Sequence, residues 1–205
     1  MREATDKARA LSAFPVLRSI EGELALYEVL LRKWQARINL VSAATLDHIW
    51  SRHFADSAQL LPFAPDAKTW VDLGSGGGFP GLVLALLLKE ANGASVTLVE
   101  SDSRKAAFLR EVSRETCAPV EVLNVRLETL PPELRPDVIT SRALAPVSRL
   151  ADTITSWLQH GATGLFLTGE GGPSNVPANL HVQTSPSRTG PGFVVKVTSR
   201  ESRPL

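Results

Sequence analysis

The chain has 205 residues, of which 43% are hydrophobic and 21% charged, and its formal net charge is +1. This composition excludes a disordered chain and a histone-like polycation, so any contact with nucleic acid needs a local basic patch. The longest apolar run, from Gly81 to Leu88, is too short to span a membrane, and the charged N-terminus is unlike a secretory signal. The single cysteine, Cys117, excludes an internal disulfide. We therefore expect a soluble, cytoplasmic monomer without a membrane partner.

The first third of the chain has the pattern of amphipathic helices. Apolar side chains recur there at spacings of three and four residues, as in Leu24, Tyr27, Leu30, Leu31 and Trp34. A further helix is expected from Leu46 to Leu61, where Pro62 ends it. We therefore expect residues 1–66 to form an N-terminal helical extension packed on the remaining core.

From Trp70 onward, short apolar strands alternate with helices. The expected strands are Trp70–Leu73, Ser95–Glu100, Val120–Val125, Asp137–Ser141 and Gly164–Thr168. The expected helices are Pro80–Glu90, a helix capped by Ser103 that ends near Cys117, and Pro146–Leu158. Leu180–Gln183 and Phe193–Thr198 are expected to add a C-terminal antiparallel hairpin. This order predicts an α/β fold over residues 67–205, with a mostly parallel Rossmann-like sheet.

A glycine-rich turn follows the first of these strands and can be read in two registers. Gly76, Gly78 and Gly81, with Glu100 downstream, satisfy the dinucleotide fingerprint G-x-G-x-x-G. Counted from Asp72, the same turn is D-x-G-x-G-x-G, the usual first motif of S-adenosylmethionine-dependent methyltransferases.

The chemistry of the two ligands favours the methyltransferase register. A dinucleotide places its pyrophosphate on a helix N-terminus, but Pro80 removes one N–H that a phosphate needs. In the methyltransferase register, bare backbone at Gly74 and Gly76 admits a methionine moiety, and Asp72 suits its ammonium group. Glu100, at the end of the second strand, is expected to accept both ribose hydroxyls. A tight turn without a ligand is the disfavoured alternative.

Four ordered motifs resemble one known family. They are Asn39-Leu40-Val41-Ser42, Arg52-His53-Phe54-Ala55-Asp56-Ser57, the turn from Asp72 to Gly81, and Thr140-Ser141-Arg142-Ala143. Together they are similar to the bacterial small-subunit ribosomal RNA guanine-N7 methyltransferases, also called glucose-inhibited division protein B. The resemblance covers about Leu24 to Thr168.

This resemblance implies a methyltransferase fold, S-adenosyl-L-methionine as cofactor and small-subunit ribosomal RNA as partner. Matched to the family's motifs, the donor-binding residues are Gly74, Phe79, Leu127, Glu128 and Arg142. Arg142 is also a candidate contributor to catalysis; the alternative is a surface ion pair of Arg142 with Asp137 or Glu170. Arg52 and His53 lie in a family motif and are expected to contact the RNA. One departure is Thr168, where the family usually has lysine.

Methylation of guanine N7 needs alignment but no base, because N7 already carries a lone pair. We therefore expect positional catalysis, with His53 hydrogen-bonded to Asp56 rather than acting as a base. The spacing of the histidines indicates no metal site. Two alternatives remain open: a methyltransferase for a small molecule or protein, and an NAD-dependent reductase or nucleotide-binding module.

Overall fold

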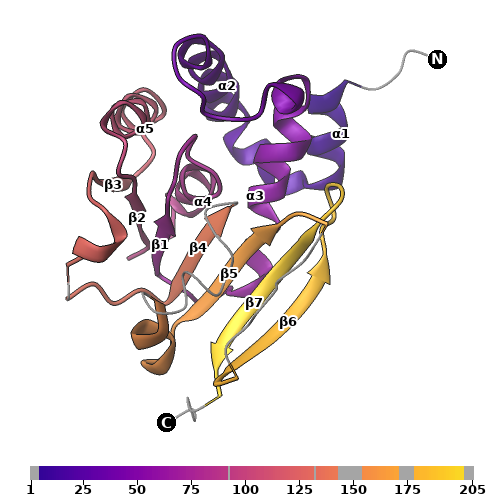
Figure 1. Cartoon of the computed structure of the whole chain (residues 1–205). Helices are drawn as coiled ribbons and strands as arrows, with labels where there is room; N and C mark the ends of the chain where they lie inside the picture. The colour runs from indigo at the N-terminus through magenta and orange to yellow at the C-terminus, as the bar shows by residue number, and fades with distance from the viewer. Residues whose placement is uncertain (1–4, 92, 132, 143–153, 171–177, 201–205) are drawn as a thin grey trace.

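The structure, a computed structural model, describes residues 5–91, 93–131, 133–142, 154–170 and 178–200. Its centre is a seven-stranded sheet with the strand order β3-β2-β1-β4-β5-β7-β6 (Figure 1). The strands are β1 (Thr69–Leu73), β2 (Ser95–Val99), β3 (Val120–Leu123), β4 (Val138–Arg142), β5 (Thr163–Thr168), β6 (Leu180–Pro186) and β7 (Phe193–Ser199). The first five strands pair in parallel, whereas β7 is antiparallel to both β5 and β6. The mostly parallel sheet and the C-terminal hairpin are thus confirmed.

Helices flank the sheet and fill the N-terminal region. They are α1 (Asp6–Ala13), η1 (Pro15–Ile20), α2 (Glu21–Gln35), η2 (Ala43–His48), η3 (Trp50–Ala55), α3 (Asp56–Ala58), η4 (Leu61–Phe63), α4 (Gly81–Leu88), α5 (Ser103–Thr116) and η5 (Leu127–Thr129). Residues 154–159 are also helical. Of the expected helix Pro146–Leu158, the part before residue 154, with Val147 and Leu150, lies outside the described residues. Within the described ranges, no helix has the length and apolar character needed to cross a membrane.

The expected helix from Leu46 to Leu61 is instead a series of 3-10, π and α turns. The physical reason is an external cap near its start. A carboxylate oxygen of Asp6 accepts hydrogen bonds from the backbone N–H groups of Trp50 (2.9 Å) and Ser51 (3.2 Å). Because these two donors point to Asp6 rather than back along the segment, the helical ladder is interrupted there.

Two helix starts also differ by one residue from the sequence prediction. Asp102, not Ser103, caps α5, and its carboxylate accepts from the backbone N–H groups of Arg104 (2.8 Å) and Lys105 (3.2 Å). Aspartate caps a helix as well as serine does, so residue type alone did not separate the two positions. Pro80 directly precedes α4 instead of opening it.

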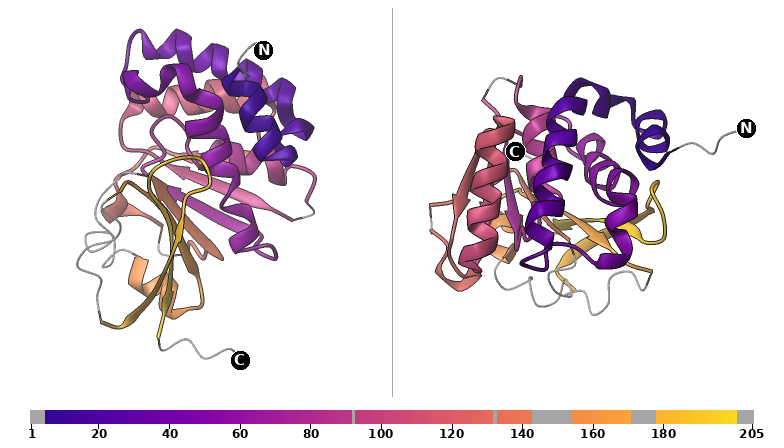
Figure 2. Two further views of the ribbon diagram at one scale, coloured as in Figure 1. Left: turned by 90° about the vertical axis from the view of Figure 1, so that its right-hand side faces the viewer. Right: turned by 90° about the horizontal axis from the view of Figure 1, so that it is seen from above.

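Alternate residues of the central strands supply two hydrophobic cores. Trp70 of β1 packs with the N-terminal helices, α4 and α5, whereas Val71 and Leu73 pack with Ile154 and Leu158 on the opposite face. The N-terminal helices therefore share one continuous core with the helices of the α/β part. Figure 2 shows α2 and α5 lying side by side, as their contacts also indicate.

The strand order reverses between β1 and β4, and this position locates the site. Neighbouring connections leave in opposite directions there, which opens a crevice at the carboxyl ends of the two strands. In Figure 1 the N-terminal helices lie near the tips of β4 and β5, and the turn between β6 and β7 rises toward α1 and α3. Three parts of the chain thus meet at one edge of the sheet.

Candidate active site

A cavity of about 640 Å³ lies at this edge. The sequence-predicted residues that line it are Gly74, Gly76, Phe79, Glu100, Leu127, Arg142 and His53. The segment from Leu40 to Thr45 forms another part of its wall. The cavity therefore joins the glycine turn to the N-terminal extension.

The glycine turn adopts backbone conformations that favour glycine. The φ angles of Gly74, Gly76 and Gly78 are 66°, 53° and 87°. A Cβ on Gly78 would clash with the side chains of Leu82 and Tyr27. The turn thus needs glycine both for its own geometry and for the close approach of α2.

Glu100 is built into the turn. Its Oε2 accepts a hydrogen bond from the Gly76 N–H (2.9 Å), and its Oε1 accepts one from the Asp102 N–H (2.7 Å). The side chain is only 7% exposed, yet it lines the cavity. Each carboxylate oxygen has a second acceptor position. The carboxylate is therefore held in place, and it can still accept hydrogen bonds from two neighbouring hydroxyl groups.

We expect Glu100→Ala to weaken S-adenosylmethionine binding by about 1.5–3 kcal/mol, the range for hydrogen bonds to a charged group. Isothermal titration calorimetry with the donor and with its 2′-deoxy analogue checks this. The analogue should bind much more weakly than the donor to the wild type, and this difference should shrink in the variant. An equal difference in both proteins would contradict ribose binding by Glu100.

Asp72 does not line the cavity, contrary to its expected role beside an ammonium group. It is 1% exposed, and its carboxylate accepts from the Thr140 hydroxyl (3.0 Å) and the Gly81 N–H (3.3 Å). Burial raises the pKa of Asp72 to about 7, although the hydrogen bonds from Ser75, Thr140 and Gly81 oppose this effect. Asp72 therefore ties β1 to β4 and to the start of α4 beneath the turn.

Three rings stack beside the cavity, and two of them, Phe79 and His53, line it. The Phe79 ring stacks on Tyr27, with centroids 5.3 Å apart and an interplanar angle of 10°, and on His53, with values of 4.7 Å and 26°. The Tyr27 hydroxyl donates a hydrogen bond to the Gly77 carbonyl. Through Tyr27, helix α2 supports both the aromatic stack and the glycine turn.

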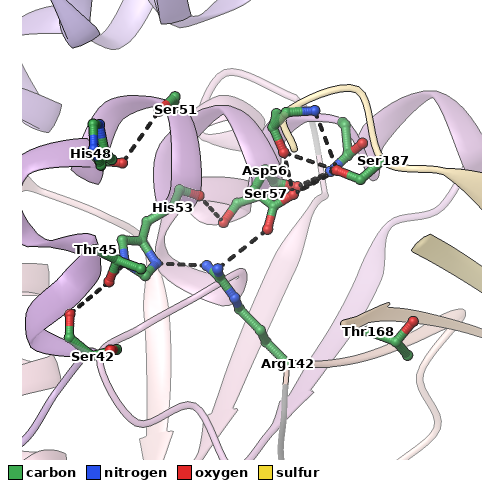
Figure 3. Close-up of polar contacts among 12 residues, drawn as sticks. Ser42, Thr45, His48, Ser51, His53, Asp56, Ser57, Arg142, Thr168 and Ser187 are labelled. Carbon is green, nitrogen blue, oxygen red and sulfur yellow. Dashed lines mark hydrogen bonds and ion pairs between the residues drawn. The ribbon is translucent and has the colours of Figure 1, made fainter. Parts of the chain in front are cut away.

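The cavity is polar where Arg142 and His53 line it, and the hydrogen bonds there run in one direction (Figure 3). Arg142 can only donate, so its contact with His53 Nδ1 (2.6 Å) leaves the proton of that ring on Nε2. Nε2 then donates to the Thr45 hydroxyl (2.9 Å), which donates to the Ser42 carbonyl (2.8 Å). The chain of contacts thus requires a neutral His53.

Burial lowers the pKa of His53 to about 3, and the charges of Arg142 and Arg52 contribute to the shift. The expected hydrogen bond from His53 to Asp56 is absent from the contacts of the described residues, since both ring nitrogens have other partners. A neutral ring cannot attract an RNA phosphate by charge. His53 is therefore a wall of the cavity rather than part of a basic patch.

Arg142 pairs with Asp56, not with Asp137 or Glu170. Its Nη2 lies 3.4 Å from Asp56 Oδ2. Asp137 instead accepts from the backbone N–H groups of Lys68 and Thr69, at the other end of β4. Side chains alternate along a strand, so Arg142 shares the face of Thr140 and points toward the N-terminal helices.

Two predicted site residues lie away from the cavity wall. Glu128 is exposed on η5, and Arg52 is half-buried beside Gly190. Thr168 also lies outside it, within hydrogen-bond distance of the Phe193 carbonyl. Thr45 and Lys105 line the cavity but were missed by the sequence analysis. Thr45 lies three residues after a quoted motif, which was the only signal for it. Lys105, in the first turn of α5, flanks no quoted motif, so no sequence signal pointed to it.

A glycine turn after β1 and a carboxylate after β2 are shared with dinucleotide-binding folds. The antiparallel strand β7 beside β5, in the order β3-β2-β1-β4-β5-β7-β6, is typical of the class of S-adenosylmethionine-dependent methyltransferases. A family model described as rRNA small subunit methyltransferase G matches residues 20–186. The ribosomal RNA small subunit methyltransferase G of Bradyrhizobium diazoefficiens is 44% identical over 98% of this chain and 80% of its own length. That of Rhodopseudomonas palustris BisB18 is also 44% identical, over 97% of this chain and 88% of its own. The chain belongs to this family.

Solved structures agree on the fold. The cofactor-bound Rv0187 from MTB superposes with a TM-score of 0.63 at 16% identity, over 98% of this chain and 100% of that one. A mutant of MtNAS in complex with S-adenosylmethionine gives a TM-score of 0.60 at 19% identity, over 88% of this chain and 76% of that one. At these identities the likeness concerns the fold alone.

Proposed function

We propose that this chain transfers a methyl group from S-adenosylmethionine to N7 of a guanine in small-subunit ribosomal RNA. The observation that carries the proposal is the single cavity that joins the glycine turn to the polar end at Arg142, in a chain of this family. The glycine backbone and the carboxylate of Glu100 suit the donor. The polar end suits the edge of a purine, because arginine N–H groups donate well to guanine O6.

The cavity residues fit S-adenosylmethionine, which supplies the methyl group when bound. Gly74 and Gly76 leave backbone open to the cavity, Glu100 presents carboxylate oxygens, and Leu127 adds an apolar wall. Arg142 and His53 line the other end, where they would orient the base. Alignment is the main task of these residues, because N7 attacks through an existing lone pair.

The finer parts of the proposal concern partners and location. We propose a monomer without a membrane partner that meets its RNA in the cytoplasm, with residues 1–66 as a helical extension of the core. Arg52 stays a prediction as an RNA contact, and Glu128 stays a prediction as a donor contact. A contact between an arginine and a phosphate makes RNA affinity fall as the salt concentration rises. If Arg52 makes such a contact, the RNA affinity of Arg52→Gln should depend less on salt.

The direct test is methyl transfer from labelled S-adenosylmethionine to purified small subunits and to their naked RNA. N7-methylguanosine is then located by reduction and aniline cleavage. Label at one guanine N7 supports the proposal. Label only in ribosomal protein, or tight NAD binding without S-adenosylmethionine binding, would favour the alternatives.

We expect the single-turnover rate at saturating RNA and donor to vary less than about twofold between about pH 6.5 and 8.5, the range in which a catalytic histidine titrates. His53, with a pKa of about 3, is deprotonated throughout this range. Asp72, with a pKa of about 7, does titrate within it, so the profile is also measured in Asp72→Asn. A steep rise that persists in Asp72→Asn and disappears in His53→Asn would make His53 a general base and contradict positional catalysis.

A further inference from the structure

Behind Arg142 lies a buried carboxylate whose role the alignment of donor and base does not explain. Asp56 is 6% exposed, and its two oxygens face different partners (Figure 3). Oδ2 lies 3.4 Å from Arg142 Nη2. Oδ1 accepts from the Gln59 amide (2.6 Å), the Ser187 hydroxyl (3.1 Å) and the Thr189 hydroxyl (2.5 Å). All the donors at Oδ1 are neutral, so the only cation paired with this carboxylate among the described residues is Arg142.

The turn between β6 and β7 holds this arrangement in place. Besides the hydroxyls of Ser187 and Thr189, the Arg188 N–H donates to Gln59 Oε1 (3.0 Å). The turn therefore binds Asp56 both directly and through Gln59. A carboxylate fixed by several hydrogen bonds keeps its orientation, so its Oδ2 stays directed at Arg142.

The charges around Arg142 show what Asp56 offsets. Burial lowers the pKa of Arg142, Asp56 opposes that effect and Arg52 adds to it. His53, which faces Arg142 from the other side, contributes no positive charge because its Nδ1 accepts the hydrogen bond. Without Asp56, Arg142 would therefore line the cavity with no anion paired to it among the described residues, and the positive charge of Arg52 would act on it unopposed.

The donor brings a positive charge into the same cavity, and the proposed reaction moves that charge without removing it. The N7 lone pair forms the new N–C bond, and the electron pair of the broken S–C bond stays on sulfur. No proton leaves, so one positive charge moves from the sulfonium to the purine. A neighbouring unpaired cation would oppose both donor binding and methylation, because like charges repel strongly where water is excluded.

We propose that Asp56 is the counter-charge of the cavity: it neutralises Arg142 so that this guanidinium can line a space that must also hold a sulfonium. The inference rests on the proposed function. Asp56 touches Arg142 rather than the cavity itself, and it is therefore a positioning residue. Its contribution should depend on the charge of the ligand, which distinguishes it from a purely structural role.

The test compares two ligands of nearly the same shape by calorimetry. S-adenosylmethionine carries a net charge of +1, whereas S-adenosylhomocysteine is neutral overall. Asp56→Asn should weaken binding of the first by about tenfold relative to the second, because Arg142 is left unpaired. The double variant Asp56→Asn with Arg142→Met should bring the ratio of the two affinities back toward the wild-type value.

Asp137→Asn is the matched control, since it removes the same charge at the far end of β4. It should leave the ratio unchanged. Equal weakening of both ligands in Asp56→Asn, or a ratio that the double variant does not recover, would overturn the counter-charge proposal. Failure of the wild type to bind S-adenosylmethionine would instead contradict the proposed function, which keeps the two conclusions separate.

Discussion

Gly74→Val is expected to weaken S-adenosylmethionine binding by at least about 100-fold, or about 2.7 kcal/mol. Gly74 lines the cavity with a φ of 66°, a conformation that a β-branched residue adopts only under strain. The valine side chain would also occupy space where the donor approaches bare backbone. Calorimetry with the purified variant measures the loss, and an unchanged affinity would remove this turn from the donor site.

Gly93→Val is the matched control for this substitution. Gly93 has a φ of 77°, and a Cβ placed there meets nothing within 4 Å. It therefore carries a comparable backbone strain, which costs about 1–2 kcal/mol, without adding bulk to the cavity. Both variants should lose a similar amount of stability in urea denaturation, but Gly93→Val should keep its donor affinity.

Arg142→Met is expected to lower the free energy of unfolding by about 3 kcal/mol and the methyl-transfer rate by about 100-fold. The stability loss arises because Asp56, with a side chain 9% exposed, would remain buried without its cation. The rate falls because the cavity loses the group proposed to orient the base. Urea denaturation and single-turnover kinetics measure the two effects separately.

Two further variants, a control and a double variant, show whether that result comes from the pairing of Arg142 with Asp56. Arg114→Met removes an arginine that is 70% exposed and paired with Glu115, so it should change stability by less than about 0.5 kcal/mol. Arg142→Met combined with Asp56→Asn should regain part of the lost stability, since no unpaired buried charge remains. Its rate should stay low. Full stability in the single variant would contradict the pairing of Arg142 with Asp56.

Local patterns in the sequence were sufficient for the fold class. The period of the helices, the short apolar strands and the glycine turn depend on neighbouring residues, so they can be read from one sequence. Apart from two helix starts that differ by one residue, the exception arose where a distant side chain acts on the backbone. Asp6 interrupts the helix at Trp50 from far along the chain, and no local pattern reports that contact.

The grouping of the proposed donor-binding residues along one cavity was predictable for the same reason. Gly74, Gly76 and Glu100 follow adjacent strands of a parallel sheet, and such strand ends meet at one edge. How deeply a side chain is buried cannot be read from strand order in this way, because packing determines it. The sequence predicted a ligand contact for Asp72 and a contact with His53 for Asp56, yet the structure buries both carboxylates and pairs them with other groups.

By itself, the sequence determined the class of fold, the edge of the sheet that carries the proposed donor site, and the residue types available there. Only the tertiary structure decided the partners of Arg142, the neutral state of His53 and the contact of the β6–β7 turn with Asp56. These depend on bringing the N-terminal helices, β4 and the C-terminal hairpin to one point. The physical reason is that charge pairing and protonation follow from distance and burial, which packing sets and local sequence does not encode.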